Sequence, residues 1–414
     1  MSDLSLSDAL AERIRALAQS EKISVEELLT IMVDRYTVAS RLSVAEDQLK
    51  VSGTEEDTQS SPEHPAFRGY PSGDLNAITP DNIDQMTVLG ALDFPDRVNC
   101  IEFSPDGKYL AIRFKTRMVL WDMRTSQEYA VFEHDAWIET FAFTPDGKSL
   151  IVSTGNMLSK TTTGSTLHYW NVETRQEEYT WKPQVGFANT IVIDPQNPQV
   201  IALLSVEREI VKDRPNAITI SNVGIELWDG KNLVTRYTDF RQFYRKGYNI
   251  LNDRVLAFGN DGKTLFVCLN NGGHFGGQVL AWEGLGNGEV KAISEPNECF
   301  MGLTLDRQGA QLATSNAPEG KLSVRNLSSG TVIYSNEDAH QRPYGLEFDR
   351  TGKMLVVSRT PRSREAGRVD FINLQTGETI RKLTSPGHIS MSFSPDNTIF
   401  ALKTDVVLLW GMPQ

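Results

Sequence analysis

The chain has 414 residues, of which 40% are hydrophobic and 23% are charged, and its formal net charge is −12. This composition is typical of a folded globular protein, and no apolar run reaches the roughly 18 residues that a membrane-spanning helix needs. The negative charge disfavours whole-body attraction to nucleic acid or to anionic lipid, because the long-range field repels phosphate groups.

The three cysteines, Cys100, Cys268 and Cys299, show no paired spacing. An odd number of cysteines inside or beside apolar runs is typical of reduced core thiols. The N-terminus has no basic segment followed by an apolar core, so no signal peptide is predicted. We therefore expect a cytoplasmic protein without structural disulfides.

Residues 1–50 carry the only helical periodicity in the chain. Apolar residues at helical spacing predict one helix around Ile14 and a second helix around Met32. Ser24 and Glu27 form a capping box, which places the start of the second helix. The apolar faces of both helices need a surface to pack against.

A short strand followed by two helices, over Leu4 to Tyr36, resembles the ribbon-helix-helix fold, in which two chains pair their N-terminal strands and read the DNA major groove. Here the outward strand positions are Ser5 and Ser7, and residues 1–60 hold six Lys/Arg against twelve Asp/Glu. Phosphate contacts supply much of the affinity in such complexes, so DNA binding is not expected. We interpret residues 1–50 as a homodimerisation module, with a helical hairpin that packs on another protein as the alternative. The predicted dimerisation residues are Leu4, Leu6, Ile14, Leu28 and Met32.

Residues 51–76 are predicted to be a flexible acidic linker. The segment is polar, acidic and rich in Ser, Pro and Gly. It has too little apolar surface to fold alone, and its charge favours extension.

From Ala77 onward, one all-β unit of about 40 residues repeats. In its first copy, Val98–Tyr129, apolar residues alternate along three short runs, and Ser104-Pro105-Asp106-Gly107 forms a turn between the first two. This turn returns as Thr144-Pro145-Asp146-Gly147, Asn260-Asp261-Gly262, Asp306-Arg307-Gln308-Gly309, Asp349-Arg350-Thr351-Gly352 and Ser394-Pro395-Asp396-Asn397, with Asp194-Pro195-Gln196-Asn197 as a weaker copy. A third-strand marker returns as Trp121-Asp122, Trp170-Asn171, Trp228-Asp229, Trp282-Glu283, Arg325-Asn326, Ile372-Asn373 and Trp410-Gly411.

With these two markers in alternation, residues 77–414 resemble a seven-bladed WD-repeat β-propeller. The predicted blades are 98–134, 137–183, 187–240, 253–295, 299–338, 343–385 and 388–412. The last blade lacks a fourth strand, and Met86–Leu92 is predicted to supply it and to close the ring. Ile78–Asn82 would then lie at the outer rim. The repeated tryptophans are predicted to pack between blades.

No catalytic motif is present: the chain has no nucleophile elbow, no phosphate-binding loop, no H-E-x-x-H and no cysteine pair at zinc spacing. The glycine-rich stretch Asn270–Gly277 joins two strands and is interpreted as a hairpin. We therefore expect a non-enzymatic protein with no cofactor and no metal.

Loop lengths single out one face of the predicted propeller. In WD-repeat propellers the d–a and b–c loops share one face, here called the d–a/b–c face. Its loops carry the long insertions, which are 155–166, 206–222, 240–252, 270–277 and 359–367. Long loops on one face predict a recognition surface, with loop drift as the alternative.

Basic and aromatic residues recur in these loops. The predicted partner-binding residues are Lys212, Arg214, Tyr244, Arg245, Tyr248, His274, Phe275, Arg342, Tyr344, Arg359, Arg362 and Arg364. Arg and Tyr are enriched at binding hot spots, and Arg binds carboxylates through two hydrogen bonds. We expect an acidic peptide or protein partner. The alternatives are docking of the acidic stretch Glu55–Asp57, or arginines that are solvated or paired with nearby acids.

Three functions are considered. The first is an interaction scaffold that dimerises through residues 1–50 and binds a partner protein on the d–a/b–c face. The second is a regulator tethered to DNA through the N-terminal module, which the acidic N-terminus disfavours. The third is a propeller hydrolase or lactonase, which would need carboxylates and histidines converging on a metal, and the sequence shows no such set.

Overall fold

The computed structural model describes residues 66, 67, 69, 75–156, 164–210, 218–238, 255–270, 277–285, 288–294, 300–316, 320–338, 341–361, 367–385 and 390–414. The chain divides into two units, Met1–Glu63 and His64–Gln414, and every described residue belongs to the second unit. The predicted dimerisation module lies outside the described residues and stays a prediction.

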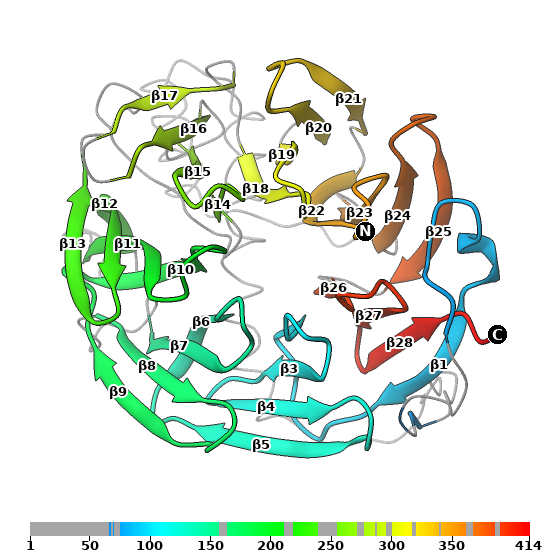
Figure 1. The fold of residues 1–414 in the computed structure, drawn as a ribbon, viewed down its shortest axis with the longest axis horizontal. Helices are drawn as coiled ribbons and strands as arrows, with labels where there is room; N and C mark the ends of the chain where they lie inside the picture. Colours follow the sequence, from blue (N-terminus) through cyan, green and yellow to red (C-terminus); the bar gives the residue numbers. More distant parts are fainter. Residues whose placement is uncertain are drawn as a thin grey trace, which may run out of the picture. The chain divides into compact units, whose positions relative to one another are not determined.

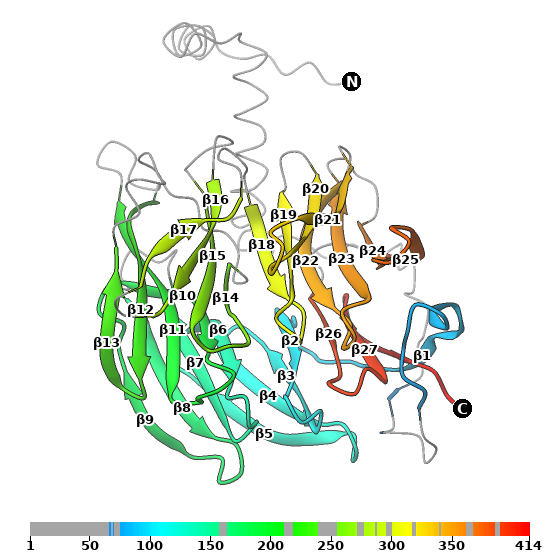
Figure 2. The ribbon, with the colours of Figure 1, turned by 45° about the horizontal axis from the view of Figure 1, so that its top comes forward.

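The described residues form seven four-stranded antiparallel sheets, which are arranged as blades around a central axis (Figure 1). In six blades the strands follow chain order from the axis outward. Figure 2 shows the strands of neighbouring blades running alongside one another. The predicted seven-bladed, all-β propeller is confirmed.

The strand bounds match the predicted blades. Blades 1 to 3 consist of β2 (Cys100–Phe103), β3 (Tyr109–Arg113), β4 (Arg117–Asp122), β5 (Gln127–Glu133), β6 (Trp137–Phe143), β7 (Ser149–Gly155), β8 (Thr166–Asn171), β9 (Glu177–Trp181), β10 (Phe187–Ile193), β11 (Val200–Ile210), β12 (Ile218–Asp229) and β13 (Asn232–Tyr237). Blades 4 to 6 consist of β14 (Leu256–Phe258), β15 (Thr264–Asn270), β16 (Gly277–Glu283), β17 (Val290–Ala292), β18 (Phe300–Leu305), β19 (Gln311–Asn316), β20 (Lys321–Asn326), β21 (Val332–Glu337), β22 (Gln341–Phe348), β23 (Met354–Pro361), β24 (Gly367–Asn373) and β25 (Thr379–Ser385). Blade 7 consists of β26 (Met391–Phe393), β27 (Ile399–Lys403), β28 (Val407–Gly411) and β1 (Thr87–Leu92).

Strand β1 closes the ring as predicted. It pairs antiparallel with β28, from Thr87 opposite Gly411 to Leu92 opposite Val407. Figure 1 shows this N-terminal strand, in blue, beside the C-terminal strands, in red. The pairing gives the last blade its fourth strand and covers the β28 edge, which would otherwise be open to another chain.

Part of the predicted linker 51–76 is attached to the propeller. Phe67 is 6% exposed, and its N–H donates to the Ala91 carbonyl at 2.9 Å. A Cβ at Gly90 would lie 2.5 Å from the Phe67 Cα, so only glycine permits this approach. The prediction of a flexible linker is therefore wrong at Phe67, because this apolar side chain packs in the core.

The segment before β1 is also more buried than predicted. Ile78 is fully buried, and Ile83, in the short 3-10 turn η1 (Ile83–Gln85), is 2% exposed. Both pack with Met86 against apolar residues of blades 6 and 7. The rim prediction for Ile78–Asn82 is therefore wrong for Ile78, because its side chain completes a core between two blades.

Six of the seven repeated turns have one shared conformation, and the weaker copy that ends at Asn197 does not. Gly107, Gly147, Gly262, Gly309 and Gly352 have φ between 64° and 72°, and Asn397 has φ 65° at the corresponding position. Left-handed backbone of this kind favours glycine and, less strongly, asparagine. This requirement explains why the turn marker recurs in the sequence.

The core consists of apolar layers between neighbouring blades. Trp170 packs on Phe132 of the preceding blade, with ring centroids 4.7 Å apart, and Trp282 packs on Tyr237 at 5.5 Å. Aromatic pairs of this kind contribute about 0.5–1.5 kcal/mol beyond the area that they bury. For these two tryptophans, the predicted packing between blades is confirmed.

One predicted insertion is largely strand. In 206–222, strands β11 and β12 stay paired as far as Ile210 opposite Ile218. The β-branched residues at both ends of this hairpin favour extended backbone. The prediction of a long loop is wrong for 206–210 and 218–222, because these residues extend strands β11 and β12.

Candidate functional site

Several charged side chains gather at blade 6 on the described part of the d–a/b–c face. Strand β22 begins there, β23 ends there and β24 begins there, because neighbouring strands are antiparallel. Strand β21 of blade 5 ends at the same face. The site, here called the blade 6 cluster, consists of Asn336, Asp338, Gln341, Arg342, Arg359, Arg368 and Asp370.

A buried ion pair forms the base of the blade 6 cluster. The Arg359 Nε donates to Asp370 Oδ2 at 2.8 Å, and both side chains are 2% exposed. The Arg359 Nη2 also reaches Asn336 Oδ1 at 3.4 Å. Charges buried this deeply need partners of this quality, because the cost of removing them from water is several kcal/mol per ion.

Arg359 was predicted to contact a partner, and that prediction is wrong. Strand β23 extends to Pro361, so Arg359 lies in a strand within the sheet. Side chains alternate between the two faces of a strand, and the Arg359 side chain lies on the face that contacts Asp370. Its role is to hold the cluster together.

Arg368 extends the network toward the surface. Its Nε donates to Asp370 Oδ1 at 2.9 Å, and its Nη2 donates to Asp338 Oδ2 at 2.7 Å. Arg368 lies directly opposite Arg359 across the two strands. Two like charges placed opposite each other repel, so Asp370 stabilises the pair by bonding to both.

Polar atoms without partners lie beside this network. Within the described residues, the Arg342 Nε, the Gln341 Oε1 and the Arg359 Nη1 are buried and have no hydrogen-bond partner. Gln341 and Arg342 lie on β22, and Arg359 lies on the neighbouring strand β23, opposite Pro343. The three atoms therefore belong to one pair of strands. These three atoms are therefore available to bond a group that enters the cluster.

The chemistry of the cluster suits an anion. Three arginines accompany two aspartates, and Arg342 has no ion pair in the described part of the chain. Arg342 and Tyr344 lie near the start of β22, one of the strands nearest the central axis (Figure 1). A guanidinium donor beside an amide acceptor matches a carboxylate next to a peptide N–H group.

Most predicted partner-binding residues lie outside the described residues. These are Lys212, Arg214, Tyr244, Arg245, Tyr248, His274, Phe275, Arg362 and Arg364. Arg342 and Tyr344 are described, are half-buried and lie two residues apart on one strand. The predicted dimerisation residues Leu4, Leu6, Ile14, Leu28 and Met32 also lie outside the described part.

Sequence reasoning missed Gln341, Arg368 and Asp370. A signal for Asp370 was present. It lies two residues before the blade 6 marker, a position that holds Val119, Leu280 and Leu408 in three blades and another buried carboxylate, Glu226, in blade 3. A buried carboxylate needs a partner of opposite charge.

A second polar cluster connects blades 1 and 2. The ring of His134 lies 4.5 Å from the ring of His168, which bonds Thr154 Oγ1 and Glu177 Oε2 at 2.9 Å each. Burial, and to a smaller extent the nearby His168, lowers the pKa of His134 to about 4. His134 is therefore neutral at physiological pH, which suits a packing role between blades.

The described residues contain no group of three or more His, Cys, Asp or Glu side chains placed to hold a metal ion. In the same part of the chain, no helix is long and apolar enough to cross a membrane.

Comparisons with known proteins identify the fold. No family model matches the chain, and no curated protein matches it. Among solved structures, it is similar to the β-propeller domain of Cps50 (Swd1) from Myceliophteria thermophila, with a TM-score of 0.59 and 13% identity. That match covers 79% of this chain and 99% of the other. A likeness at this level of identity shows the propeller fold and leaves function to be argued from the site.

Proposed function

We propose that this protein is a non-enzymatic interaction scaffold that binds an acidic peptide or protein through the d–a/b–c face of its propeller. The observation that carries the proposal is the blade 6 cluster, where Arg342 has no carboxylate partner in the described residues and buried donor and acceptor atoms are unsatisfied. The likeness to a solved propeller domain is consistent with a binding role at the level of fold.

The arginines of the blade 6 cluster have different roles in the proposed binding. Arg359 and Arg368 are held by Asp370 and form a fixed positive base. Arg342, which is half-buried, then supplies the donor that contacts the partner, with the Gln341 amide beneath it. Arg362 and Arg364 follow β23 in the sequence. They add positive charge to the connection between β23 and β24. Electrostatic attraction of this kind mainly raises the association rate and depends on salt.

The test uses a fluorescent synthetic peptide of alternating glutamate and glycine, with a lysine-glycine peptide as the control. We expect the acidic peptide alone to bind, more weakly as salt rises. Arg342→Ala should weaken binding by about tenfold or more, the usual effect of losing a charge-assisted hydrogen bond. Arg350→Ala is the matched control, because Arg350 is exposed in the turn at the opposite end of the same blade. Equal binding by the two variants, or by the two peptides, would contradict the proposal.

We also propose that residues 1–50 make the scaffold a homodimer, so that two propellers present two copies of the site. The test compares the solution mass of the full chain with that of a chain beginning at His64, which keeps the buried Phe67. A dimer for the full chain and a monomer for the shorter chain are expected. Two monomers would reject the dimerisation module.

A further inference from the structure

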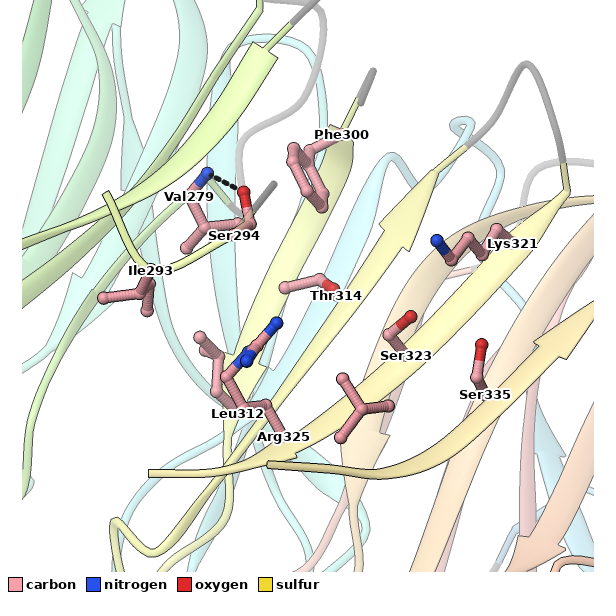
Figure 3. Close-up of a pocket in the computed structure, with 11 residues that line it drawn as sticks. Val279, Ile293, Ser294, Phe300, Leu312, Thr314, Lys321, Ser323, Arg325 and Ser335 are labelled. Carbon is pink, nitrogen blue, oxygen red and sulfur yellow. Dashed lines mark hydrogen bonds between the residues drawn. The ribbon is translucent and has the colours of Figure 1, made fainter. Parts of the chain in front are cut away.

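A cavity of about 170 Å³ lies between blades 4 and 5 (Figure 3). One wall comes from Val279, Ile293 and Ser294 of blade 4. The opposite wall comes from all four strands of blade 5. The other blade contacts of the propeller include large apolar side chains in this layer, so the cavity needs an explanation from the sequence.

The first cause is a replaced tryptophan. At one repeated position the third strand faces the preceding blade, and the residues there are Trp121, Trp170, Trp228, Trp282 and Trp410, with the apolar Ile372 in blade 6. In blade 5 this position holds Arg325, which lies opposite Leu312 just as Trp282 lies opposite Leu265. An indole ring that would fill the contact with blade 4 is therefore missing.

The second cause is a polar row across blade 5. Thr314 lies opposite Ser323, which lies opposite Ser335. At the position of Thr314 the other six blades have Ile112, Val152, Leu203, Val267, Val357 and Leu402. At the Thr314 position, a hydroxyl group thus lines the cavity floor where every other blade presents an aliphatic side chain. An aliphatic residue would stabilise the blade contact more, which argues that the hydroxyls serve another purpose.

The cavity also has an apolar part and a positive charge. Val279, Phe300 and Leu312 are each 1–2% exposed. Figure 3 shows the side chains of Arg325 and Lys321 extending into the space between the two blades. The Arg325 Nη1 donates to the Gly330 carbonyl at 2.5 Å, but no carboxylate in the described residues forms an ion pair with Arg325.

We propose that this cavity binds a small organic carboxylate, in which the charged group is attached to a compact apolar body. Arg325 would bind the carboxylate, the hydroxyls of Thr314 and Ser323 would donate to it, and the apolar wall would cover the body of the ligand. A cavity of about 150 Å³ holds one benzene ring, so this one accommodates a ligand of similar size. The chemistry fits a free organic acid or a glutamate side chain of another polypeptide. The site lies between two blades and does not rest on the proposed function.

The test measures binding of benzoate to the full chain by saturation-transfer NMR. Benzamide, which has the same shape and no charge, is the ligand control. We expect benzoate to bind with a dissociation constant of about 1 mM or below, and benzamide to bind about tenfold more weakly. N-acetylglutamate amide is measured in parallel. Tighter benzoate binding assigns the site to a free acid, and tighter binding of the glutamate derivative assigns it to a side chain.

Two variants test the assignment of the site. Arg325→Gln removes the charge and should weaken benzoate binding about tenfold. Arg325→Trp restores the repeated residue, should abolish binding by filling the cavity, and should raise the thermal midpoint. Arg350→Gln, in an exposed turn, should bind like the wild type. No saturable benzoate binding, equal binding of benzamide, or unchanged binding by Arg325→Gln would overturn the proposal.

Discussion

The buried charges of blade 6 predict an unequal response to two substitutions. Asp370→Asn removes the carboxylate that bonds both Arg359 and Arg368. Arg359→Met removes one cation and leaves Asp370 bonded to Arg368. The loss of the single acid should therefore destabilise the propeller more than the loss of one of its two bases.

The expected magnitudes follow from the contacts. After Asp370→Asn, Arg359 is a buried cation without a counter-ion, directly opposite a second arginine. Breaking a buried pair in this way costs about 3–5 kcal/mol. After Arg359→Met, the remaining carboxylate keeps Arg368 at 2.9 Å, so the loss should be about 1.5–3 kcal/mol, the usual contribution of a charged hydrogen bond.

Thermal unfolding followed by tryptophan fluorescence would compare the two variants. For a unit of this size, each kcal/mol should shift the thermal midpoint by roughly 1–2 °C, so we expect Asp370→Asn to lower it by about 3–10 °C. The free energy of unfolding lost by the double variant should be smaller than the sum of the two single losses. If Arg359→Met were as unstable as Asp370→Asn, the central role of Asp370 would be refuted.

Two further predictions concern single positions. Asn397 has φ 65°, and its side chain donates to the Ile78 carbonyl. Asn397→Gly should therefore cost less stability than Asn397→Ala, which loses the bond and also strains the backbone by about 1 kcal/mol. Equal thermal midpoints would contradict this reasoning. The pKa of His134 is lowered to about 4 in the folded state. As the pH falls, His134 is therefore protonated in the unfolded chain before it is protonated in the folded chain. Stability should thus be lost between about pH 6.5 and pH 4. His134→Leu should lose less stability over that interval in urea unfolding, and an unchanged pH dependence would count against it.

The fold could be predicted because its rules are local. The Asp-Gly turns mark residues that need left-handed backbone, and the Trp-Asp markers identify one strand in most blades. The closing strand Met86–Leu92 followed from an incomplete last repeat. Each signal is present within a few residues of sequence.

The site was harder to predict because it depends on contacts between distant residues. Arg359 looked like a loop residue, since nothing near it in sequence shows that β23 continues to Pro361 or that Asp370 lies within reach. Phe67 was similar, because its partner Ala91 belongs to another segment. The cavity at Arg325 could have been found, since a charged residue at a repeated tryptophan position is visible in the sequence alone.

The closing strand has a consequence for how the protein is made. Thr87 is synthesised before the six blades that precede its partner strand, and it pairs with Gly411 at the far end of the propeller sequence. Until β28 is made, β1 lacks its partner strand and the ring of blades stays open. Loop-closure entropy makes so distant a pairing slow. A chain that stops before β28 cannot close the ring and keeps exposed strand edges, which favour aggregation and proteolysis.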